Sequence, residues 1–564
     1  MKKKTLLLVI PFLLTACGGN STANSSNGGC DPDDMFCEDT PSTSMEKIEL
    51  EEDTNQDYIL DKNVSNENAS VNYEVFVRSF CDSNGDGIGD LNGLTSKLDY
   101  LKDLGVKNLW LMPINDSPSY HGYDVSDYYS INPDYGTMED LENLVSEAKK
   151  HNIGIILDMV FNHSSTRNEW FKQSYEDYLY ENPSSYSKAT WYNWNNKSSQ
   201  VYKHSYGGTE TYYEGGFGSS MPDLNLDNEQ VREEIKKISK KYIDIGVAGF
   251  RLDAVLYYYS NVNENVKFLS WLNDYCKSLN PDFYIVGECW SSKETINSYY
   301  SSGVDSFFFF PSSIEGTGKG SIISTVKGGN DAHSFGTYIE QQEKDMKAIN
   351  PKAVSSYFLT NHDTDRASNS LYGYSAKAAA SLIYLMPGTP YMYYGEEIGL
   401  IGVRTKHPDD QSDVKRRLPI IWSKNDKVGE CEFPEKNRLD LDTTKQVTEG
   451  VYDQLETPYS LVNHYRKVLN IRNKYSFIRD AKFTNLTSLV KDQNAKVLVY
   501  KLESATDSKD SIIVVHNFDS VAVKVDLKTI GSEILETINV SRKIPKLEGH
   551  VLSIGNYSTV ILKA

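Results

Sequence analysis

Eight short apolar segments, separated mostly by stretches long enough for a helix, constrain the fold of this 564-residue chain more than any other feature. They cover residues 73–80, 106–114, 153–163, 246–253, 283–289, 304–310, 353–363 and 389–395. Helical spacing appears between them, with leucines at 91, 94, 98, 101 and 104 and a capping-box start at Thr137 and Asp140. Alternating strands and helices imply parallel pairing, so we expect an α/β fold built on a closed (β/α)8 TIM barrel.

Two regions depart from this alternation. Residues 163–225 are rich in Tyr, Trp, Asn, Ser and Gly with little periodicity, which indicates a domain inserted after the third strand. After about residue 476 the strands 496–502, 511–518, 521–527 and 558–564 follow one another without helices, as in a small antiparallel β domain. We therefore expect a barrel at 71–162 and 226–476, an inserted domain at 163–225 and a C-terminal domain at 477–564.

The N-terminus has the pattern of a secretory signal. Three lysines at positions 2–4 precede the apolar run Thr5–Leu14, which is too short for a comfortable membrane span. The ending Leu14-Thr15-Ala16-Cys17 resembles a bacterial lipobox, so we expect a signal peptide at 1–16, a lipid on Cys17 and anchoring at the cell surface or another extracytoplasmic face. An ordinary cleaved signal with an incidental cysteine is the alternative. Residues 17–70 are polar and acidic and are predicted to form a flexible tether.

Charge and cysteine content narrow the partners. The net charge of -20 argues against nucleic acid or an anionic membrane surface as a binding partner and fits a neutral or cationic ligand. Six cysteines remain besides Cys17, of which Cys30 and Cys37 are close enough in sequence to pair; the others have no recognisable spacing.

The loop "CDSNGDGIGDLNG" (81–93) has the residue types of a cation site. Asp82, Asn84, Asp86 and Asp90 are spaced around glycines, and hard cations prefer such oxygen ligands. An EF-hand would need Glu where Gly93 stands, and no second copy of the loop occurs. A metal clip within a larger domain therefore explains the loop better than a calcium sensor.

Ionisable residues gather at the ends of four predicted strands, where barrels of this kind carry their chemistry. The clusters are Asp158-Asn162-His163, Arg251-Asp253, Glu288 and His362-Asp363. Arg251 and Asp253 are two residues apart and point the same way on a strand, so we expect the guanidinium to lower the carboxyl pKa and keep Asp253 ionised. Glu288 follows an apolar strand, where partial desolvation would raise its pKa and suit it to donate a proton. One ionised and one protonated carboxyl are what glycoside cleavage requires.

Four of these segments, "DMVFNH" (158–163), "GFRLDA" (249–254), "GEC" (287–289) and "FLTNHD" (358–363), resemble the signature segments of the α-amylase superfamily of glycoside hydrolases. Matching segments at 120–125, 221–225 and 387–399 extend the resemblance from about Tyr73 to the C-terminus. Within this superfamily the chain is similar to the surface-anchored lipoprotein α-amylases of bacterial starch-utilisation systems. The resemblance implies a barrel, a domain B after the third strand and a C-terminal β-sandwich.

The resemblance also implies roles for single residues. Asp253 would be the nucleophile, Glu288 the general acid/base and Asp363 the carboxylate that grips sugar hydroxyls and stabilises the transition state. Tyr123 would stack on the sugar, with His163, Arg251 and His362 binding hydroxyls or ordering the carboxylates. Related oligo-1,6-glucosidases carry the 82–90 loop as a structural Ca²⁺ or Mg²⁺ site, and the implied ligands are Asp82, Asn84, Asp86, Asp90 and the Ile88 carbonyl.

One departure bears on the function. Many α-amylases have Lys-His where this chain has Leu256-Tyr257, which puts a second calcium and one substrate contact in doubt.

At Tyr120 the related exo-acting α-glucosidases typically have an Asp that closes the pocket, so we expect an open cleft here, along which a longer chain continues.

The leading prediction is a retaining α-amylase that cleaves internal α-1,4 bonds of starch and maltooligosaccharides, with other carbohydrate-uptake proteins as candidate partners. The alternatives are an α-glucosidase, an oligo-1,6-glucosidase or a neopullulanase-like debranching hydrolase, and, from another class, a non-catalytic starch-binding lipoprotein. The intact trio of acidic residues speaks against the last.

Overall fold

Seven parallel strands form the central sheet of the folded chain. The computed structural model describes residues 48–54, 66–181, 187–316, 318–404, 412–434, 446–490 and 495–564. The signal peptide at 1–16, Cys17, Cys30, Cys37 and most of the predicted tether lie outside these residues. The sheet has the order β11-β10-β9-β5-β2-β1-β12, and its members are β1 (Asn72–Val75), β2 (Asn108–Leu111), β5 (Gly154–Met159), β9 (Gly249–Leu252), β10 (Tyr284–Gly287), β11 (Ser306–Phe307) and β12 (Tyr391–Tyr393).

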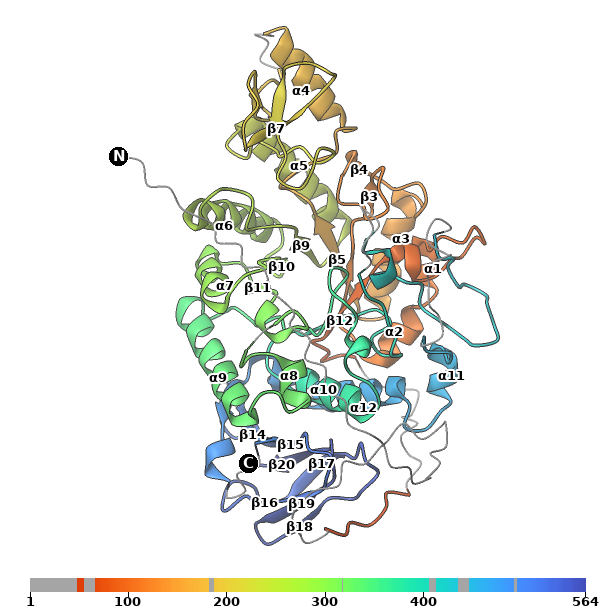
Figure 1. Ribbon diagram of the computed structural model, residues 1–564, viewed down its shortest axis with the longest axis vertical. Helices are drawn as coiled ribbons and strands as arrows, with labels where there is room; N and C mark the ends of the chain where they lie inside the picture. Colours follow the sequence, from red (N-terminus) through yellow and green to blue (C-terminus); the bar gives the residue numbers. More distant parts are fainter. Residues whose placement is uncertain are drawn as a thin grey trace, which may run out of the picture. The chain divides into compact units, whose positions relative to one another are not determined.

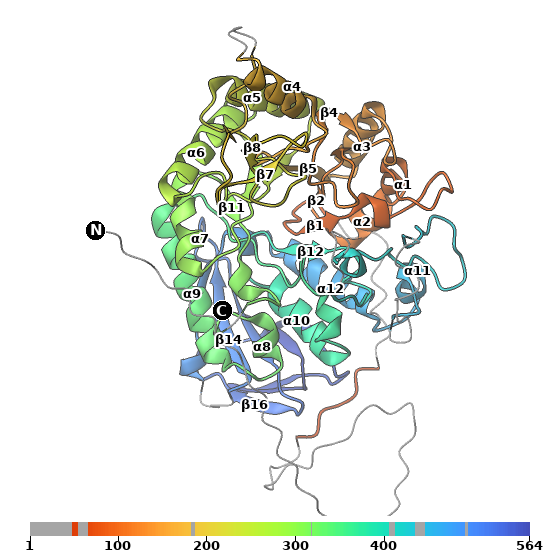
Figure 2. The ribbon, with the colours of Figure 1, turned by 45° about the horizontal axis from the view of Figure 1, so that its top comes forward.

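The remaining predicted strand, 353–363, is not a regular strand in the structure. It contributes two isolated parallel bridges, from Ser356 to Phe308 and from Phe358 to Tyr391, which place it between β11 and β12. The ring of strands is thereby completed, with helices on its outside (Figure 2). The predicted (β/α)8 barrel is confirmed, although the segment in one of its eight strand positions is held only by isolated bridges.

Helices surround the ring, and their local sequence explains where they begin. The leucine pattern at 91–104 forms two short helices rather than one, because the chain turns at Ser96 and Lys97 between α1 and α2. The Thr137–Asp140 capping box is present at the start of α3, as predicted. The helices of the barrel and its extensions are α1 (Leu91–Thr95), α2 (Leu98–Leu104), α3 (Met138–Lys150), α5 (Glu229–Ile245), α6 (Val262–Leu279), α7 (Lys293–Tyr299), α8 (Ile322–Val326), α9 (Ala332–Ile349), α10 (Tyr374–Tyr384), α11 (Val451–Leu455) and α12 (Leu461–Lys474).

Two small antiparallel units extend from the barrel. β3 (Asn115–Asp116) pairs with β4 (Asp127–Ile131) after the second barrel strand. Between β5 and α5 the chain forms α4 (Glu169–Leu179) and a three-stranded sheet of order β6-β8-β7, with β6 (Trp194–Asn195), β7 (Tyr202–Ser205) and β8 (Tyr212–Glu214). The ring of Phe171 packs among four aromatic rings and joins α4 to this sheet.

The C-terminal region consists of two antiparallel sheets that share an apolar core of valine, leucine and isoleucine side chains. Their orders are β13-β14-β15-β20-β17 and β16-β19-β18. All four strands predicted here are present, and α9 contacts β13 and β14 (Figure 1). The bounds are β13 (Lys482–Asn485), β14 (Val497–Glu503), β15 (Ser511–Asn517), β16 (Val523–Asp526), β17 (Ile534–Ile538), β18 (Lys546–Glu548), β19 (Val551–Ile554) and β20 (Thr559–Lys563).

Parts of the segment predicted as a tether are packed. Residues 48–54 run along the turn at 539–544: Glu52 bridges Lys543, and the Asp53 N–H donates to the Arg542 carbonyl at 2.8 Å. Residues 66–70 are largely buried, and the Asn66 amide donates to the carbonyls of Val106 and His151. In the described ranges, no helix combines the length and the apolar character that crossing a membrane requires.

Candidate active site

The register of the barrel strands brings the predicted site residues together. Asp158 on β5 lies opposite Arg251 on β9, and Arg251 lies opposite Val286 on β10. Side chains two residues further along a strand point the same way. Asp253 and Glu288 therefore stand one step above this layer, at the C-terminal edge of the ring. Trp110, Ile156 and Tyr391 belong to an apolar cluster inside the ring.

Arg251 is the centre of the cluster. Its guanidinium is buried and reaches three carboxylates: Nη1 lies 2.8 Å from Asp158 Oδ1 and 2.7 Å from Asp253 Oδ1, and Nη2 lies 3.0 Å from Glu288 Oε2. A planar, forked cation suits such a position because it holds several oxygen acceptors in fixed directions. The side chains of Asp253 and Glu288 thus lie on the two arms of one guanidinium.

The backbone around Asp253 and Glu288 is shaped to bring them close. Ala254 has a φ of 51°, a left-handed conformation that costs energy in a non-glycine residue and occurs often at functional sites. This turn directs its N–H to Glu288 Oε2 at 2.9 Å. A Cβ at Gly287 would lie 2.6 Å from the Phe307 ring, so only glycine allows this approach just before Glu288.

Burial governs the protonation of the three carboxyls around Arg251. Desolvation raises the pKa of Glu288, as predicted, and raises the pKa of Asp158 to about 7. It also raises the pKa of Asp253, because burial outweighs the opposing pull of Arg251. Arg251 acts to lower the pKa of Asp253, as expected, but the expected net lowering below the usual range is wrong, because desolvation outweighs Arg251.

Two neighbouring cations keep the Asp363 carboxyl ionised. His362 Nε2 lies 3.0 Å from Asp363 Oδ2, and Arg417 Nη2 donates to Asp363 Oδ1 at 2.8 Å. Burial acts to raise the pKa of Asp363, but these neighbours outweigh it and hold the pKa well below its usual range. His362 is charged in turn: burial alone would lower its pKa, but Asp363 and Glu74, whose Oε1 lies 2.6 Å from Nδ1, raise the pKa to about 9.

Tyr123 and His163 lie beside this cluster, as predicted. The Tyr123 ring stacks on His362 with centroids 5.5 Å apart, and its hydroxyl donates to Asp158 Oδ2 at 3.1 Å. His163 follows β5 and is buried, which lowers the pKa of its ring to about 4 and keeps it neutral.

Tyr120 lies at the edge of the same site. Its ring meets Phe76 edge-on at 5.2 Å, the Arg78 guanidinium lies over it at 5.4 Å, and its hydroxyl donates to the Arg417 carbonyl at 3.4 Å. Tyr120 thus packs against residues that follow β1.

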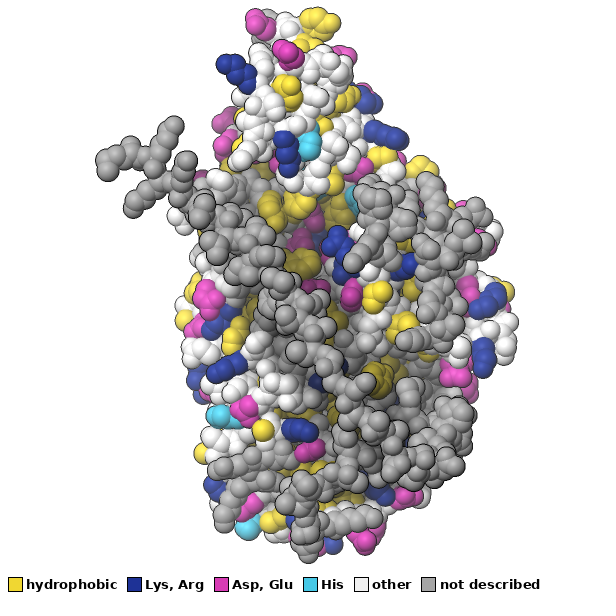
Figure 3. Space-filling model, viewed as in Figure 1, with side chains coloured by type: hydrophobic (Ala, Val, Ile, Leu, Met, Phe, Trp, Pro, Cys, Tyr) yellow, Lys and Arg dark blue, Asp and Glu magenta, His cyan; other side chains and the backbone are white. Residues whose placement is uncertain are grey.

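Three exposed aromatic side chains near the site were not predicted as site residues. Tyr257, four residues after Asp253, is 61% exposed and meets Phe217 edge-on at 5.0 Å, and Phe217 contacts the His163 ring at 5.1 Å. Trp290, two residues after Glu288, is 43% exposed and stacks on Phe310 at 4.6 Å. The space-filling view shows hydrophobic and acidic side chains in a hollow of the surface below the part that holds α4 and β7 (Figure 3).

Sequence reasoning also missed Glu74 and Arg417. Glu74 left a usable signal, because it is the one acidic residue in the first apolar segment, 73–80. Arg417 follows a short helical turn at 414–416 and left no signal, since nothing in its local sequence points to Asp363.

The 82–90 loop is closed by its own hydrogen bonds. Asp82 accepts from the N–H groups of Asn84, Gly85 and Gly87, and Asp90 from Ser83 and Gly93. Asn84 and Asp86 each accept one N–H from two residues ahead, and the predicted ligand Ile88 donates the second of these. Within the ranges described above, no three or more His, Cys, Asp or Glu side chains are arranged to hold a metal ion. The predicted ligand set also includes the Asn84 side chain and the Ile88 carbonyl, which are not among these four residue types.

Comparisons with known proteins agree on one family. Residues 74–481 match the family described as "Alpha amylase, catalytic domain". "Alpha-amylase 3" of Dictyoglomus thermophilum is 38% identical over 88% of this chain and 93% of its own length. "Alpha-amylase SusG" of Bacteroides thetaiotaomicron is 27% identical over 88% and 91%. Relatives named as maltase or glucosidase match over a similar share of the chain.

A solved structure gives the same result. "Eubacterium rectale Amy13B" superposes with a TM-score of 0.80 at 35% identity and covers 89% of this chain and 97% of its own.

We predict that Glu74→Gln weakens the alkaline pH dependence of stability. Folding raises the pKa of His362 from about 6.5 to about 9, so binding of this proton stabilises the folded state. The stabilisation is fully present below pH 6.5 and is lost as the pH rises through 9. The difference corresponds to about 3 kcal/mol in the free energy of unfolding. Without the Glu74 carboxylate the pKa of His362 falls, so the loss of stability between pH 6.5 and 9 should shrink.

Urea unfolding at several pH values measures this loss. Glu147→Gln, which changes an exposed ion pair with Lys150, is the matched control and should keep the native pH dependence. An unchanged pH dependence in Glu74→Gln would contradict the assignment of a charged His362.

Proposed function

This chain belongs to the alpha-amylase family of glycoside hydrolases, and on that basis we propose that it is a retaining α-amylase that cleaves internal α-1,4 bonds of starch and maltooligosaccharides. The observation that carries the proposal is the placement of Asp253 and Glu288 on the two arms of Arg251, beside an Asp363 held ionised by His362 and Arg417.

The proposed reaction has two displacements. The Glu288 carboxyl, whose raised pKa favours the protonated form, gives its proton to the glycosidic oxygen while Asp253 attacks the anomeric carbon and forms a covalent glycosyl ester. Glu288, now ionised, then takes a proton from water, and the water oxygen displaces Asp253. Asp363 accepts hydrogen bonds from sugar hydroxyls, and its charge stabilises the cationic transition state.

Protonation couples the roles of the two acids. Arg251 cannot compensate three ionised carboxylates at once, so the cluster favours a state in which a proton remains bound. In the proposed mechanism that proton resides on Glu288 when Asp253 attacks. The roles of Tyr123, His163, Arg251 and His362 are then to orient the sugar and the carboxylates.

Internal cleavage is supported by the surroundings of the site. Tyr120 supplies no carboxylate that would grip a chain end, and the exposed rings of Tyr257, Phe217 and Trp290 offer apolar faces on which further glucose units stack. The α-glucosidase alternative comes from relatives with such names and requires a closed pocket.

We predict retention of anomeric configuration, with carboxyl groups about 5–5.5 Å apart. Proton NMR of the first product should show the α-anomer, whereas an initial β-anomer would exclude the double displacement. Asp253→Asn should lose several orders of magnitude in kcat and still fold, because the amide keeps the shape of the side chain. Asp345→Asn, at a half-buried residue of α9 that pairs with Lys293, is the control and should retain full activity.

We predict that the native chain digests amylose from within. Iodine staining should collapse well before much reducing sugar appears. Tyr257→Ala should lower kcat/KM for amylose more than for maltotriose, since only the longer chain reaches that ring. Glucose released from the first minutes, with persistent iodine colour, would favour the α-glucosidase alternative instead.

A structural Ca²⁺ or Mg²⁺ at the 82–90 loop is a further proposal, supported by the residue pattern of the loop. Ca²⁺ added to metal-free protein should raise the Tm, because a cation relieves repulsion among the loop carboxylates. Asp86→Ala should abolish this rise, and the exposed Asp134→Ala should leave it intact. Equal Tm values with and without divalent ions would rule out the site.

Lipid anchoring at Cys17 is proposed from the lipobox-like sequence alone. Cys17→Ser should move the protein from the membrane fraction to the soluble fraction, since a bacterial lipoprotein depends on its acyl chains for firm attachment. Leaving Cys30 and Cys37 unchanged in this variant isolates the effect. Unaltered fractionation would indicate an ordinary signal peptide.

A further inference from the structure

A cavity of about 390 Å³ opens between the end of α4 and the end of β6, away from the barrel strands. Its volume falls in the range of roughly 300–1,000 Å³ that small-molecule sites occupy. The lining residues are Asp177, Tyr178, Leu179, Glu181, Ala189 and Asn196. None of them belongs to the active site described above.

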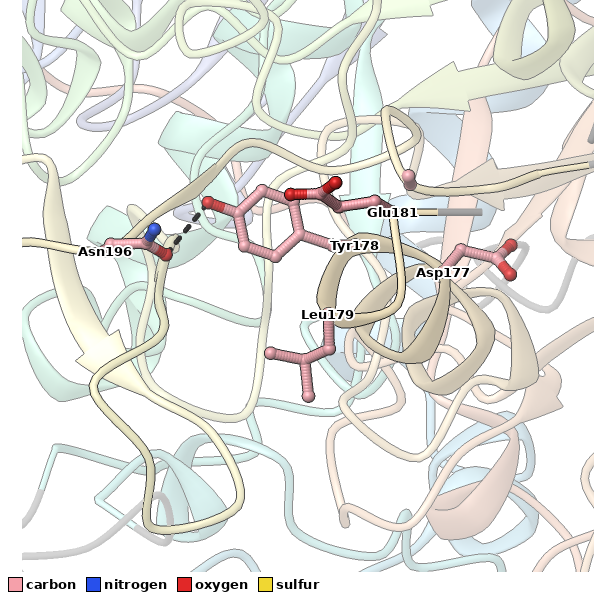
Figure 4. A pocket seen from close by; sticks show the side chains of 6 residues that line it. Asp177, Tyr178, Leu179, Glu181 and Asn196 are labelled. Carbon is pink, nitrogen blue, oxygen red and sulfur yellow. Dashed lines mark hydrogen bonds between the residues drawn. The ribbon is translucent and has the colours of Figure 1, made fainter. Parts of the chain in front are cut away.

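The aromatic wall of this cavity is held in place from behind. Tyr178 stacks on Trp194 with centroids 5.9 Å apart and planes 24° apart, and its hydroxyl donates to Asn196 Oδ1 at 3.0 Å (Figure 4). Trp194 is fixed in turn by the ring of Phe171 at 5.0 Å and by a hydrogen bond to Ser174. The Tyr178 ring is therefore preorganised, which lowers the entropy lost when a ligand packs against it.

Two polar side chains, Asn196 and Glu181, flank this ring (Figure 4). Glu181 lies beside it on the side away from Asn196 (Figure 4), and the buried Asp177 carboxylate is oriented by the Gln173 amide and the Lys188 N–H. Carboxylates accept hydrogen bonds from hydroxyls, and the Asn196 amide group can donate as well as accept. Leu179 and Tyr180, 44% and 82% exposed, continue the apolar surface outward.

An aromatic face bordered by acceptors and an amide fits a ligand with apolar ring faces and many hydroxyls. Sugars have this chemistry. A metal ion fits less well, because no group of three metal-ligating side chains occurs in the described part of the chain. None of the six described lining residues is basic, so a phosphorylated ligand is disfavoured.

We propose that this cavity, the α4–β6 site, is a second, non-catalytic binding site for an α-glucan chain, which retains the polymer while other segments of it are cut. The inference rests on the proposed function for the identity of the polymer. Its geometry is independent of the barrel carboxylates, so binding here does not require a working Asp253.

The test measures binding and hydrolysis separately. In the Asp253→Asn background, which leaves the polymer intact, migration through native gels containing amylopectin gives an apparent Kd. Tyr178→Ala should raise this Kd by about tenfold, a change typical of one lost aromatic contact. Asn196→Ala, on an exposed residue that leaves the Tyr178–Trp194 packing in place, should raise it by a smaller factor. Tyr372→Ala, which removes a 70% exposed ring at the start of α10, is the matched control and should bind like the parent.

Kinetics of the same changes in the active chain locate the effect. With amylopectin as substrate, Tyr178→Ala and Asn196→Ala should raise KM and leave kcat unchanged. With maltotetraose, too short to occupy both sites, neither should change. If Tyr178→Ala and Asn196→Ala migrate like the parent, the α4–β6 site is wrong. If Ca²⁺ raises the Tm of the parent but not of Glu181→Gln, the cavity binds a cation and the proposal is overturned. If the native chain fails to hydrolyse maltotetraose, the proposed function fails instead, and the gel still reports on this site.

Discussion

One buried guanidinium sets the arrangement of the acidic cluster at the C-terminal edge of the strand ring. Arg251 binds Asp158 in its own layer and Asp253 and Glu288 one step above it, so three strands are tied together at the level where the ring opens. A buried charge is costly unless its partners are in place. The positions of β5, β9 and β10 are thereby linked to one another, and a shift of any of them would leave charge unpaired.

The sequence predicted those contacts that follow from a short-range rule. Alternation along β9 placed Arg251 and Asp253 on one face, and the polar ends of four apolar segments identified their neighbours. The raised pKa of Asp253 required the structure, because it depends on how deeply the folded chain buries this carboxyl. Glu74 and Arg417 act on His362 and Asp363 from positions 288 and 54 residues away along the chain, and no local pattern encodes such distances.

The same distinction applies to the fold. The eight-unit barrel and the four C-terminal strands could be predicted because each element carries its own periodicity. The strand at 353–363 was overestimated because an apolar run does not say how many bridges it will make. The predicted tether, 17–70, was too long, because polar composition does not show that residues 48–54 contact the turn at 539–544.

That contact between residues 48–54 and the C-terminal region has a mechanical consequence. A force applied to the chain from its N-terminal side is resisted first by the contacts of Glu52 and Asp53 with the 539–544 turn, which include a hydrogen bond from Asn539 to Asp53. The load then spreads into the C-terminal sheets before it reaches residue 66 and the first barrel strand. The first barrel strand therefore takes up such a pull only after these contacts give way.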